Sequence, residues 1–205
     1  MITALWLIIL TAIVLFIVFF LWYGGNGSPM SAQEKEQWLL KCHKLYTGTE
    51  HAHLIPDAQR LLDSDDGKEF IMHNCLRYRP KALYPEGSGY GPDPRAADMR
   101  YGRIIFPRLL RYASHPVFVG RRMGGFMDYE GAPEWHYVAM VRYRSRRDFF
   151  KSFIRENDNA VIHKWAAVGQ THVFPVQSVI SFIWVRCAVA VVLAVCADVA
   201  IRLFA

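Results

Sequence analysis

The chain has 205 residues, of which 53% are hydrophobic and 20% charged, and its net charge at pH 7 is +6. This length leaves room for one domain of ordinary size together with membrane segments. The four cysteines show no disulfide or metal-finger spacing, so a disulfide framework is not expected and a reducing compartment is favoured.

Residues 1–23 form an apolar segment that contains no Asp, Glu, Lys, Arg or His. At a rise of about 1.5 Å per residue, roughly 20 such residues cross the hydrocarbon core of a bilayer. A cleaved signal peptide would carry basic residues at its start and a shorter apolar run. Neither feature is present, so we predict a retained transmembrane helix, with Trp6, Trp22 and Tyr23 near its two ends.

Residues 24–66 are predicted to form a linker followed by a helical arm. The linker, GGNGSPMS, is rich in glycine and serine. Ser31 then offers an N-cap for a helix, with Glu34 three residues later as its capping-box partner. That helix is expected to end near Gly48, and a second helix is expected over 56–62, before the turn-rich residues 63–67.

Residues 67–176 alternate between strand and helix patterns. We predict strands over 68–79, 115–123, 134–144 and 171–176, and helices over 95–112 and 145–157. Residues 163–167 either continue the second of these helices or start another short one. Pro107 is expected to kink or shorten the first of these helices, and Ser145 is expected to cap the second. The stretch 80–94 is rich in glycine and proline and is long enough to cover a site.

The order of these elements is β-α-β-β-α-β, which is the arrangement of an α+β ferredoxin-like split βαβ domain. Helices on one face of four strands leave the other sheet face uncovered. Two such domains commonly bury that face against each other, which gives a dimeric α/β barrel. The fold class predicted for the chain is therefore such a domain, over 67–176, flanked by two transmembrane helices.

Residues 177–205 contain the second predicted transmembrane helix, whose apolar run extends from Val179 to Ala200. Arg186 lies about seven residues inside this run, and Asp198 lies near its far end. Arg186 either contacts a partner helix or a lipid headgroup, or it snorkels to the interface from a shifted span, and we favour snorkelling. The alanines of the segment permit close packing with another helix.

Charge suggests on which side of a membrane the middle section lies. Lysines follow the first span at positions 35, 41 and 44, whereas the start of that span has no basic residue. This asymmetry favours a cytoplasmic domain, as in a bacterial inner-membrane protein. The middle section carries 22 Lys and Arg against 17 Asp and Glu. We expect this excess to face membrane lipids, and no nucleic acid is expected because no recognition motif is present.

Five stretches of the middle section read FIMHNCLRYRPKALYP, ADMRYGRIIFPRLL, HPVFVGRRMGGF, WHYVAMVRYRSRRDFFKSF and HKWAAVGQTHVFPV. In this order and spacing they resemble the domain-of-unknown-function 1330 family, over about residues 67–176. The resemblance implies the dimeric α/β-barrel fold of antibiotic-biosynthesis monooxygenases and EthD-like proteins, with pairing of two sheets, but it implies no activity. The terminal helices and the helical arm lie outside the family pattern and suggest a specialised membrane version.

A polar set spread over several predicted elements is the best candidate for a ligand site. It consists of Asn74, Arg77, Tyr101, His136, Arg142 and His163. Together in the barrel, these groups would bind an anionic or phenolic ligand, with a histidine as base. The alternative, which we favour, is that salt bridges fix the sheet and the dimer, with Arg77, Arg142, Arg144, Arg146 and Arg147 facing Asp98, Asp148 and Glu156.

No metal and no cofactor are expected. His51 and His53 form an HxH pair near His43, but they lie in a predicted loop without carboxylate-rich partners, so we interpret them as solvated. The sequence contains no nucleophile elbow, no dinucleotide-binding motif and no phosphate-binding loop of the GxxxxGK type.

Two functional hypotheses follow. The first is a non-enzymatic accessory or structural subunit of a membrane protein complex. Its α/β-barrel domain would make protein–protein contacts or self-associate through the sheet face, and Arg186 and Asp198 would contact partners within the membrane. The second is a membrane-bound enzyme that resembles cofactor-independent monooxygenases, or a binder of a lipophilic quinone- or phenol-like ligand. The lack of a strong catalytic motif favours the first hypothesis.

Overall fold

The structure is a computed structural model that describes residues 2–25, 27–156, 158–180 and 184–204. It divides into two compact units. One unit, which we call the terminal helices, comprises residues 1–26 and 178–205, and the other, which we call the α/β domain, comprises residues 27–177. Each unit is described by itself.

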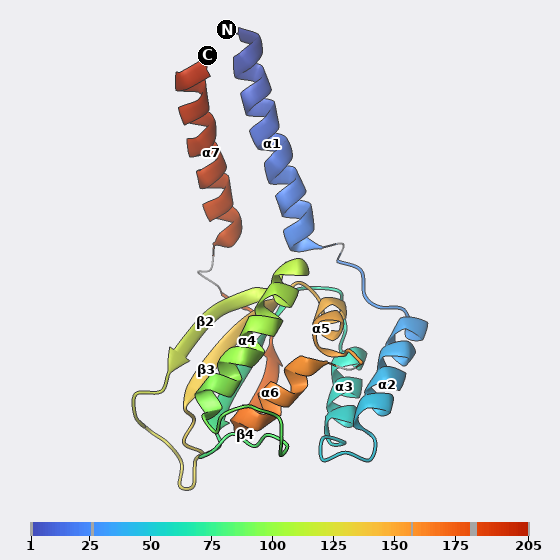
Figure 1. Cartoon of the computed structure of the whole chain (residues 1–205). Helices are drawn as coiled ribbons and strands as arrows, with labels where there is room; N and C mark the ends of the chain where they lie inside the picture. Colours follow the sequence, from blue (N-terminus) through green and yellow to red (C-terminus); the bar gives the residue numbers. More distant parts are fainter. Residues whose placement is uncertain (1, 26, 157, 181–183, 205) are drawn as a thin grey trace. The chain divides into compact units, whose positions relative to one another are not determined.

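The α/β domain has mixed α+β structure with a four-stranded antiparallel sheet, which confirms the predicted class at that level. Its elements are α2 (Ala32–Tyr46), α3 (Leu54–Asp63), β1 (Phe70–Tyr78), α4 (Pro94–Arg111), β2 (His115–Arg121), β3 (Tyr137–Tyr143), α5 (Arg146–Phe153), α6 (Asn159–Ala167) and β4 (Val168–Val176) (Figure 1). The order of helices and strands along the chain follows the predicted order.

Short polar side chains begin the helices, as the sequence pattern predicts. The hydroxyl of Ser31 accepts the backbone N–H of Glu34 at the start of α2, and the hydroxyl of Ser145 accepts that of Asp148 at the start of α5. Of the two effects expected of Pro107, a kink or a shortening, the shortening is wrong, because α4 continues to Arg111. A proline removes one helical hydrogen bond, and the packing of α4 on the sheet outweighs that loss.

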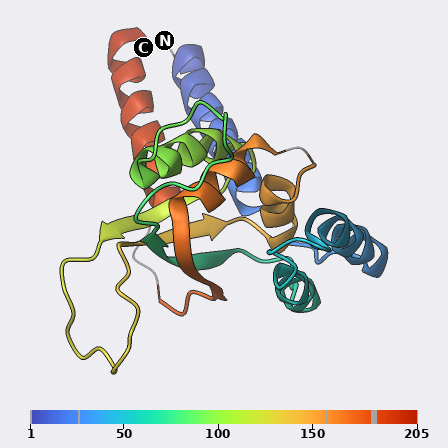
Figure 2. The same cartoon turned by 60° about the horizontal axis from the view of Figure 1, so that its bottom comes forward.

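The strands lie in the order β2-β3-β1-β4, so β1 is paired on both sides. Asn74 in the middle of β1 faces Ala139 of β3 and Val173 of β4. Figure 2 shows α4, α5 and α6 on the same face of the sheet, which we call the covered face. Because side chains alternate along a strand, each strand contributes every second residue to this face.

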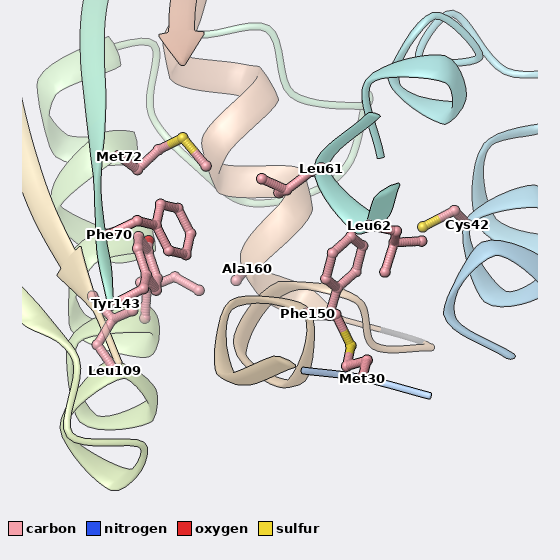
Figure 3. Packing of buried hydrophobic residues seen from close by; sticks show 11 residues of the cluster. Met30, Cys42, Leu61, Leu62, Phe70, Met72, Leu109, Tyr143, Phe150 and Ala160 are labelled. Atoms are coloured by element: carbon pink, nitrogen blue, oxygen red, sulfur yellow. The ribbon is translucent and has the colours of Figure 1, made fainter. Parts of the chain in front are cut away.

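The hydrophobic core lies between the covered face and the helices (Figure 3). Phe70, Met72 and Tyr143 enter it from the sheet, and Phe150 of α5 enters it with only 1% of its surface exposed. The helical arm extends the same cluster, because Leu62 of α3 is fully buried within it. Burial of each such side chain contributes about 1.5–3 kcal/mol to folding.

The opposite face of the sheet, which we call the open face, is covered by none of α4, α5 and α6 (Figures 1 and 2). Its side chains are largely apolar or aromatic, and by the strand register they are Ile71, His73, Cys75, Val138, Met140, His172, Phe174 and Val176. The rings of His73, His172 and Phe174 form a row, with centroids 4.8 Å and 5.0 Å apart. The domain therefore leaves an apolar surface across the middle of its sheet.

The terminal helices are α1 (Ile2–Gly24) and α7 (Val185–Phe204), and both are long and apolar enough to cross a membrane. No residue of the most apolar stretch of either helix is buried, unlike in a core helix of a soluble domain. The two helices pack against each other. The guanidinium group of Arg186 lies over the rings of Phe20 and Tyr23, 5.6 Å and 5.0 Å from their centroids.

The second span is predicted to start at Val179, and the structure corrects this start. Val179 and Ile180 form a bend and are exposed, and the helix begins at Val185. Arg186 therefore lies in the first turn of the helix and not seven residues inside it. The length of an apolar run shows how many residues are compatible with the lipid interior. It does not show at which residue the helix begins.

Other element boundaries differ by a few residues from the prediction. The last strand begins at Val168 and not at residue 171, and the helix predicted over 145–157 ends at Phe153. Parts of the predicted spans and of that helix, namely Met1, Asn157, residues 181–183 and Ala205, lie outside the described residues.

A buried ion pair joins α4 to the start of α6. Arg108 donates two hydrogen bonds to the carboxylate of Asp158, at 2.5 Å and 2.8 Å, and that carboxylate also accepts the N–H of Ala160 as the helix cap. Burial alone would raise the pKa of Asp158, but these hydrogen bonds hold it below its usual value. The carboxylate therefore stabilises the folded state while it is ionised.

Replacing Asp158 with Asn should keep the cap and remove the charge. We expect the free energy of unfolding at pH 7 to fall by about 2–3 kcal/mol. Because the folded pKa is lowered, the contribution is complete above the unfolded pKa of about 3.9 and is lost as the pH falls through the folded pKa. Denaturant unfolding of both proteins from pH 7 to pH 3 measures this, and a difference that stays constant over that range contradicts it.

Candidate functional site

A group of polar side chains lies between the sheet and helices α4 and α6. We call it the Asp98 cluster, and it consists of Tyr78, Asp98, Tyr101, Tyr137 and Lys164. The hydroxyl of Tyr78 donates to Asp98 Oδ2 at 2.9 Å, and the hydroxyl of Tyr137 donates to the same oxygen at 3.2 Å. The two tyrosines come from neighbouring strands, and their rings lie 5.5 Å apart. One carboxylate therefore connects the sheet to α4.

Lys164 of α6 brings a second charge into this cluster. Its ammonium group lies 5.9 Å from the ring centre of Tyr101 and 5.2 Å from that of Trp165. Burial lowers the pKa of Lys164, and the nearby Asp98 opposes that effect. Burial raises the pKa of Asp98 against the hydrogen bonds of the two tyrosines and the charge of Lys164. The pKa values of the two groups therefore shift toward each other.

This pattern is typical of sites that move protons. A carboxyl group with a raised pKa and an amine with a lowered pKa each exchange a proton closer to neutral pH than in water. The three tyrosines have pKa values above their usual range, first of all because of burial, so their hydroxyls stay protonated and act as donors. Such a set combines a carboxyl group, an amine and three hydroxyl groups in the layer between sheet and helices.

The structure separates the six predicted site residues into three places. Tyr101 and His163 lie in the layer under α4 and α6, as part of this cluster or next to it. Asn74 lies in the middle of the covered face, where its amide donates to the backbone carbonyls of Met72 and Ala139. The amide is thus bound within the sheet.

The remaining three predicted residues are Arg77 and Arg142 on the open face and His136 just before β3. Arg77 is exposed on the open face and donates to Gln170 at 3.4 Å. Arg142 lies at the other end of that face, buried, and binds Glu69 and the carbonyl of Ala113. The ring of His136 stacks on that of Tyr78, and its Nδ1 accepts the N–H of Tyr78 at 2.9 Å. The six residues therefore do not line one cavity.

Four residues of the Asp98 cluster are not among the predicted site residues. Asp98 is predicted only as a salt-bridge partner, and no role is predicted for Tyr78, Tyr137 and Lys164. The sequence spacing does indicate that two pairs of these residues lie close together. Asp98 and Tyr101 are three residues apart on one helix and share a face, and Tyr78 shares a strand face with Leu76, which pairs with Tyr137. The placement of Lys164 beside them required knowledge of how α6 packs.

The predicted arginine salt bridges form in part. Arg144 binds Asp148 at 2.7 Å, as expected. The partners predicted for three other arginines are wrong. Arg142 binds Glu69, Arg146 binds Asp66, and Arg147 binds Glu34. Glu156 binds Lys44, and Asp98 binds tyrosines. Charges that lie far apart in the sequence pair according to the packing of their elements.

The predicted solvated state of the HxH pair is also corrected. The ring of His51 stacks on that of Trp165, with centroids 4.0 Å apart, and only 17% of its side chain is exposed. His53 remains exposed, with Nδ1 next to the carbonyl of Glu50. His51 therefore helps to attach the loop before α3 to the end of α6.

Comparison with known proteins gives a fold match but no function. No family model and no curated protein matches the chain. Two crystal structures of RPA0582, a protein of unknown function from Rhodopseudomonas palustris, are similar, one of them in a methylated form. The TM-score is 0.53 for both, identity is 25% and 24%, and the match covers 60% of this chain and 90% or 91% of theirs. The resemblance to the domain-of-unknown-function 1330 family stays a prediction.

Replacing Tyr78 with Phe should remove one donor from the buried Asp98 and leave the ring in place. We expect the free energy of unfolding at pH 7 to fall by about 1–3 kcal/mol, because the carboxylate loses a hydrogen bond that water cannot fully replace. Denaturant unfolding measures the change. The control is Tyr129→Phe, whose side chain is 72% exposed in a loop. Equal stability of the two variants would show that the Asp98 bond is not stabilising.

Proposed function

We propose that the protein is a membrane-anchored accessory subunit that uses its α/β domain for protein–protein contacts. The observation that carries this proposal is the apolar open face in a chain that also has two helices suited to cross a membrane. Contiguous apolar surface of this kind is characteristic of interaction sites. The two spans would hold the domain at the membrane, where the other subunits reside.

The strand order β2-β3-β1-β4 supports a ferredoxin-like domain of the dimeric α/β-barrel type. In that arrangement a second copy of the chain covers the open face. Apolar side chains occupy the centre of the face, and Arg77 and Arg142 lie toward its two ends. Anchoring in one membrane favours such pairing, because it confines both copies to a thin layer and raises their effective concentration.

Gentle extraction from native membranes tests the accessory role. We expect the tagged full-length chain to co-purify with other membrane proteins at a fixed ratio, because an accessory subunit remains bound to its complex. Mass spectrometry of the purified material, before and after chemical cross-linking, measures the composition. A chain that purifies alone as a homodimer would rule out the accessory role and leave the pairing of two copies intact.

Replacing Met140 with Asp tests the pairing. Met140 lies on the open face opposite His73 and Phe118, so a carboxylate there would be buried by a second copy without a partner. We expect the variant to lose the paired form in detergent, as measured by light scattering after size exclusion, and to keep its far-ultraviolet circular dichroism. The control is Met99→Asp on α4, where the side chain is 58% exposed and the paired form should persist. An unchanged Met140→Asp assembly contradicts the role of the open face.

A second candidate function is binding or oxidation of a lipophilic phenol- or quinone-like compound, in the manner of cofactor-independent monooxygenases. The Asp98 cluster favours it, because a carboxyl group, an amine and three phenol groups share one layer. A short-chain hydroquinone added to the full-length protein in nanodiscs tests the idea by tryptophan quenching and oxygen uptake. We expect both signals to be lost in Lys164→Met and retained in Lys151→Met, and no signal in the wild-type protein excludes this function.

A further inference from the structure

A second cluster lies next to the Asp98 cluster and is not explained by either candidate function. It consists of Arg100 of α4, His163 of α6, and Tyr84 and Tyr90 of the loop between β1 and α4, and we call it the Arg100 cluster. The hydroxyl of Tyr84 lies 2.8 Å from His163 Nδ1. The rings of Tyr84 and Tyr90 meet the imidazole edge-on, at 5.7 Å and 4.9 Å. Arg100 lies over the ring of Tyr90 at 5.1 Å.

Arg100 has a buried nitrogen without a hydrogen-bond partner. Among the interactions of the described residues, its Nη1 accepts and donates nothing, and the side chain forms no ion pair with a carboxylate. The guanidinium group is charged at every relevant pH, and all its N–H groups are donors. The ring of Tyr90 lies over the cation. A buried charged donor in this state indicates a position for an acceptor from outside the chain.

His163 lies close enough to Arg100 to feel its charge. Its side chain is nine-tenths buried, with 5% of the residue exposed. Burial lowers the pKa of His163, and the charge of Arg100 lowers it further, so the ring is neutral at pH 7. When the hydroxyl of Tyr84 donates to Nδ1, the neutral ring carries its proton on Nε2. The cluster then contains a guanidinium N–H without a partner and an imidazole N–H, both on side chains that contact the ring of Tyr90.

The loop that supplies the tyrosines is hydrogen-bonded to α6, and the side chain of Tyr90 in this loop is partly exposed. The N–H of Leu83 donates to the carbonyl of Ala166 in α6 at 3.0 Å, and the N–H of Ala82 donates to the carbonyl of Pro92 at 2.7 Å. The loop thus lies beside α6 and leads to the start of α4 (Figure 1). Tyr90 is 44% exposed, so a ligand could enter beside its ring.

We propose that the Arg100 cluster is a binding site for an oxyanion, the carboxylate or phosphate group of a small ligand. A guanidinium group pairs with two oxygens of a carboxylate or phosphate by parallel hydrogen bonds. Aromatic side chains around it exclude water and strengthen such bonds. The ligand is small, because the rings of Tyr84 and Tyr90 already lie 4.7 Å apart. The site is independent of the accessory role and of the Asp98 cluster.

Anion titration of the full-length protein in nanodiscs tests the site. The probes are inorganic phosphate and benzoate, each compared with chloride at the same ionic strength, and the readout is the midpoint of thermal unfolding. We expect one of the two probes to raise the midpoint in a saturable way, since a ligand that binds the folded state stabilises it. The responding probe identifies the ligand as a phosphate or as a carboxylate. No response to either probe beyond that of chloride overturns the proposal.

A matched pair of arginine variants assigns the response to this site. Arg100→Gln should weaken the binding of the responding probe by at least about tenfold, because it removes the charged fork. Arg103→Gln, an exposed position on the same helix with the same change of charge, should bind like the wild type. Equal weakening in both variants would show a general effect of charge and overturn the assignment.

A second readout covers the case in which Arg100→Gln fails to fold. The imidazole 15N resonances of the wild-type protein report directly on His163, and His163→Gln assigns them. We expect these resonances to shift during the titration with the same midpoint as the thermal response. Resonances of His163 that do not move while the protein is stabilised would place the anion elsewhere and overturn the proposal.

Discussion

The packing of α4 and α6 against one face of the sheet is the constraint on which the α/β domain depends. Side chains of alternate strand residues enter this layer, and the residues between them remain on the open face. The hydrophobic core and the Asp98 cluster lie within the layer, and the Arg100 cluster lies where the loop between β1 and α4 meets α4 and α6. The bidentate pair of Arg108 and Asp158 joins α4 to the start of α6, the two helices that supply residues to both clusters.

Polar groups in the layer are satisfied to different degrees. Asp158 has three hydrogen bonds, and Asp98 has two tyrosine donors. Lys164, in contrast, rests on aromatic rings, and one nitrogen of Arg100 has no partner among the described residues. Fully paired groups are explained by stability alone. Incompletely paired cations in a buried layer require a different reason, and a ligand that brings its own negative charge provides one.

Local patterns predicted most of the elements and only part of the candidate site. Strands and helices were found because hydrophobic periodicity reflects which side of an element is buried. The start of α7 was misplaced because an apolar run is compatible with both a helix and a bend. Tyr101 and His163 were selected as site residues and lie in the layer. Asp98 and Lys164 were not, because each resembles an ordinary charge on a helix until α4 and α6 are packed together.

The sequence by itself determined the two apolar helices, the order of the elements and the serine caps of α2 and α5. These depend on composition or on hydrogen bonds between residues a few positions apart, so a short window contains the whole interaction. Only the tertiary structure decided the partners of Arg142, Arg146 and Arg147, the residues that share the open face, and the meeting of Arg100 with His163. Those depend on long-range packing, in which the free energy of each contact is gained only once distant elements have come together.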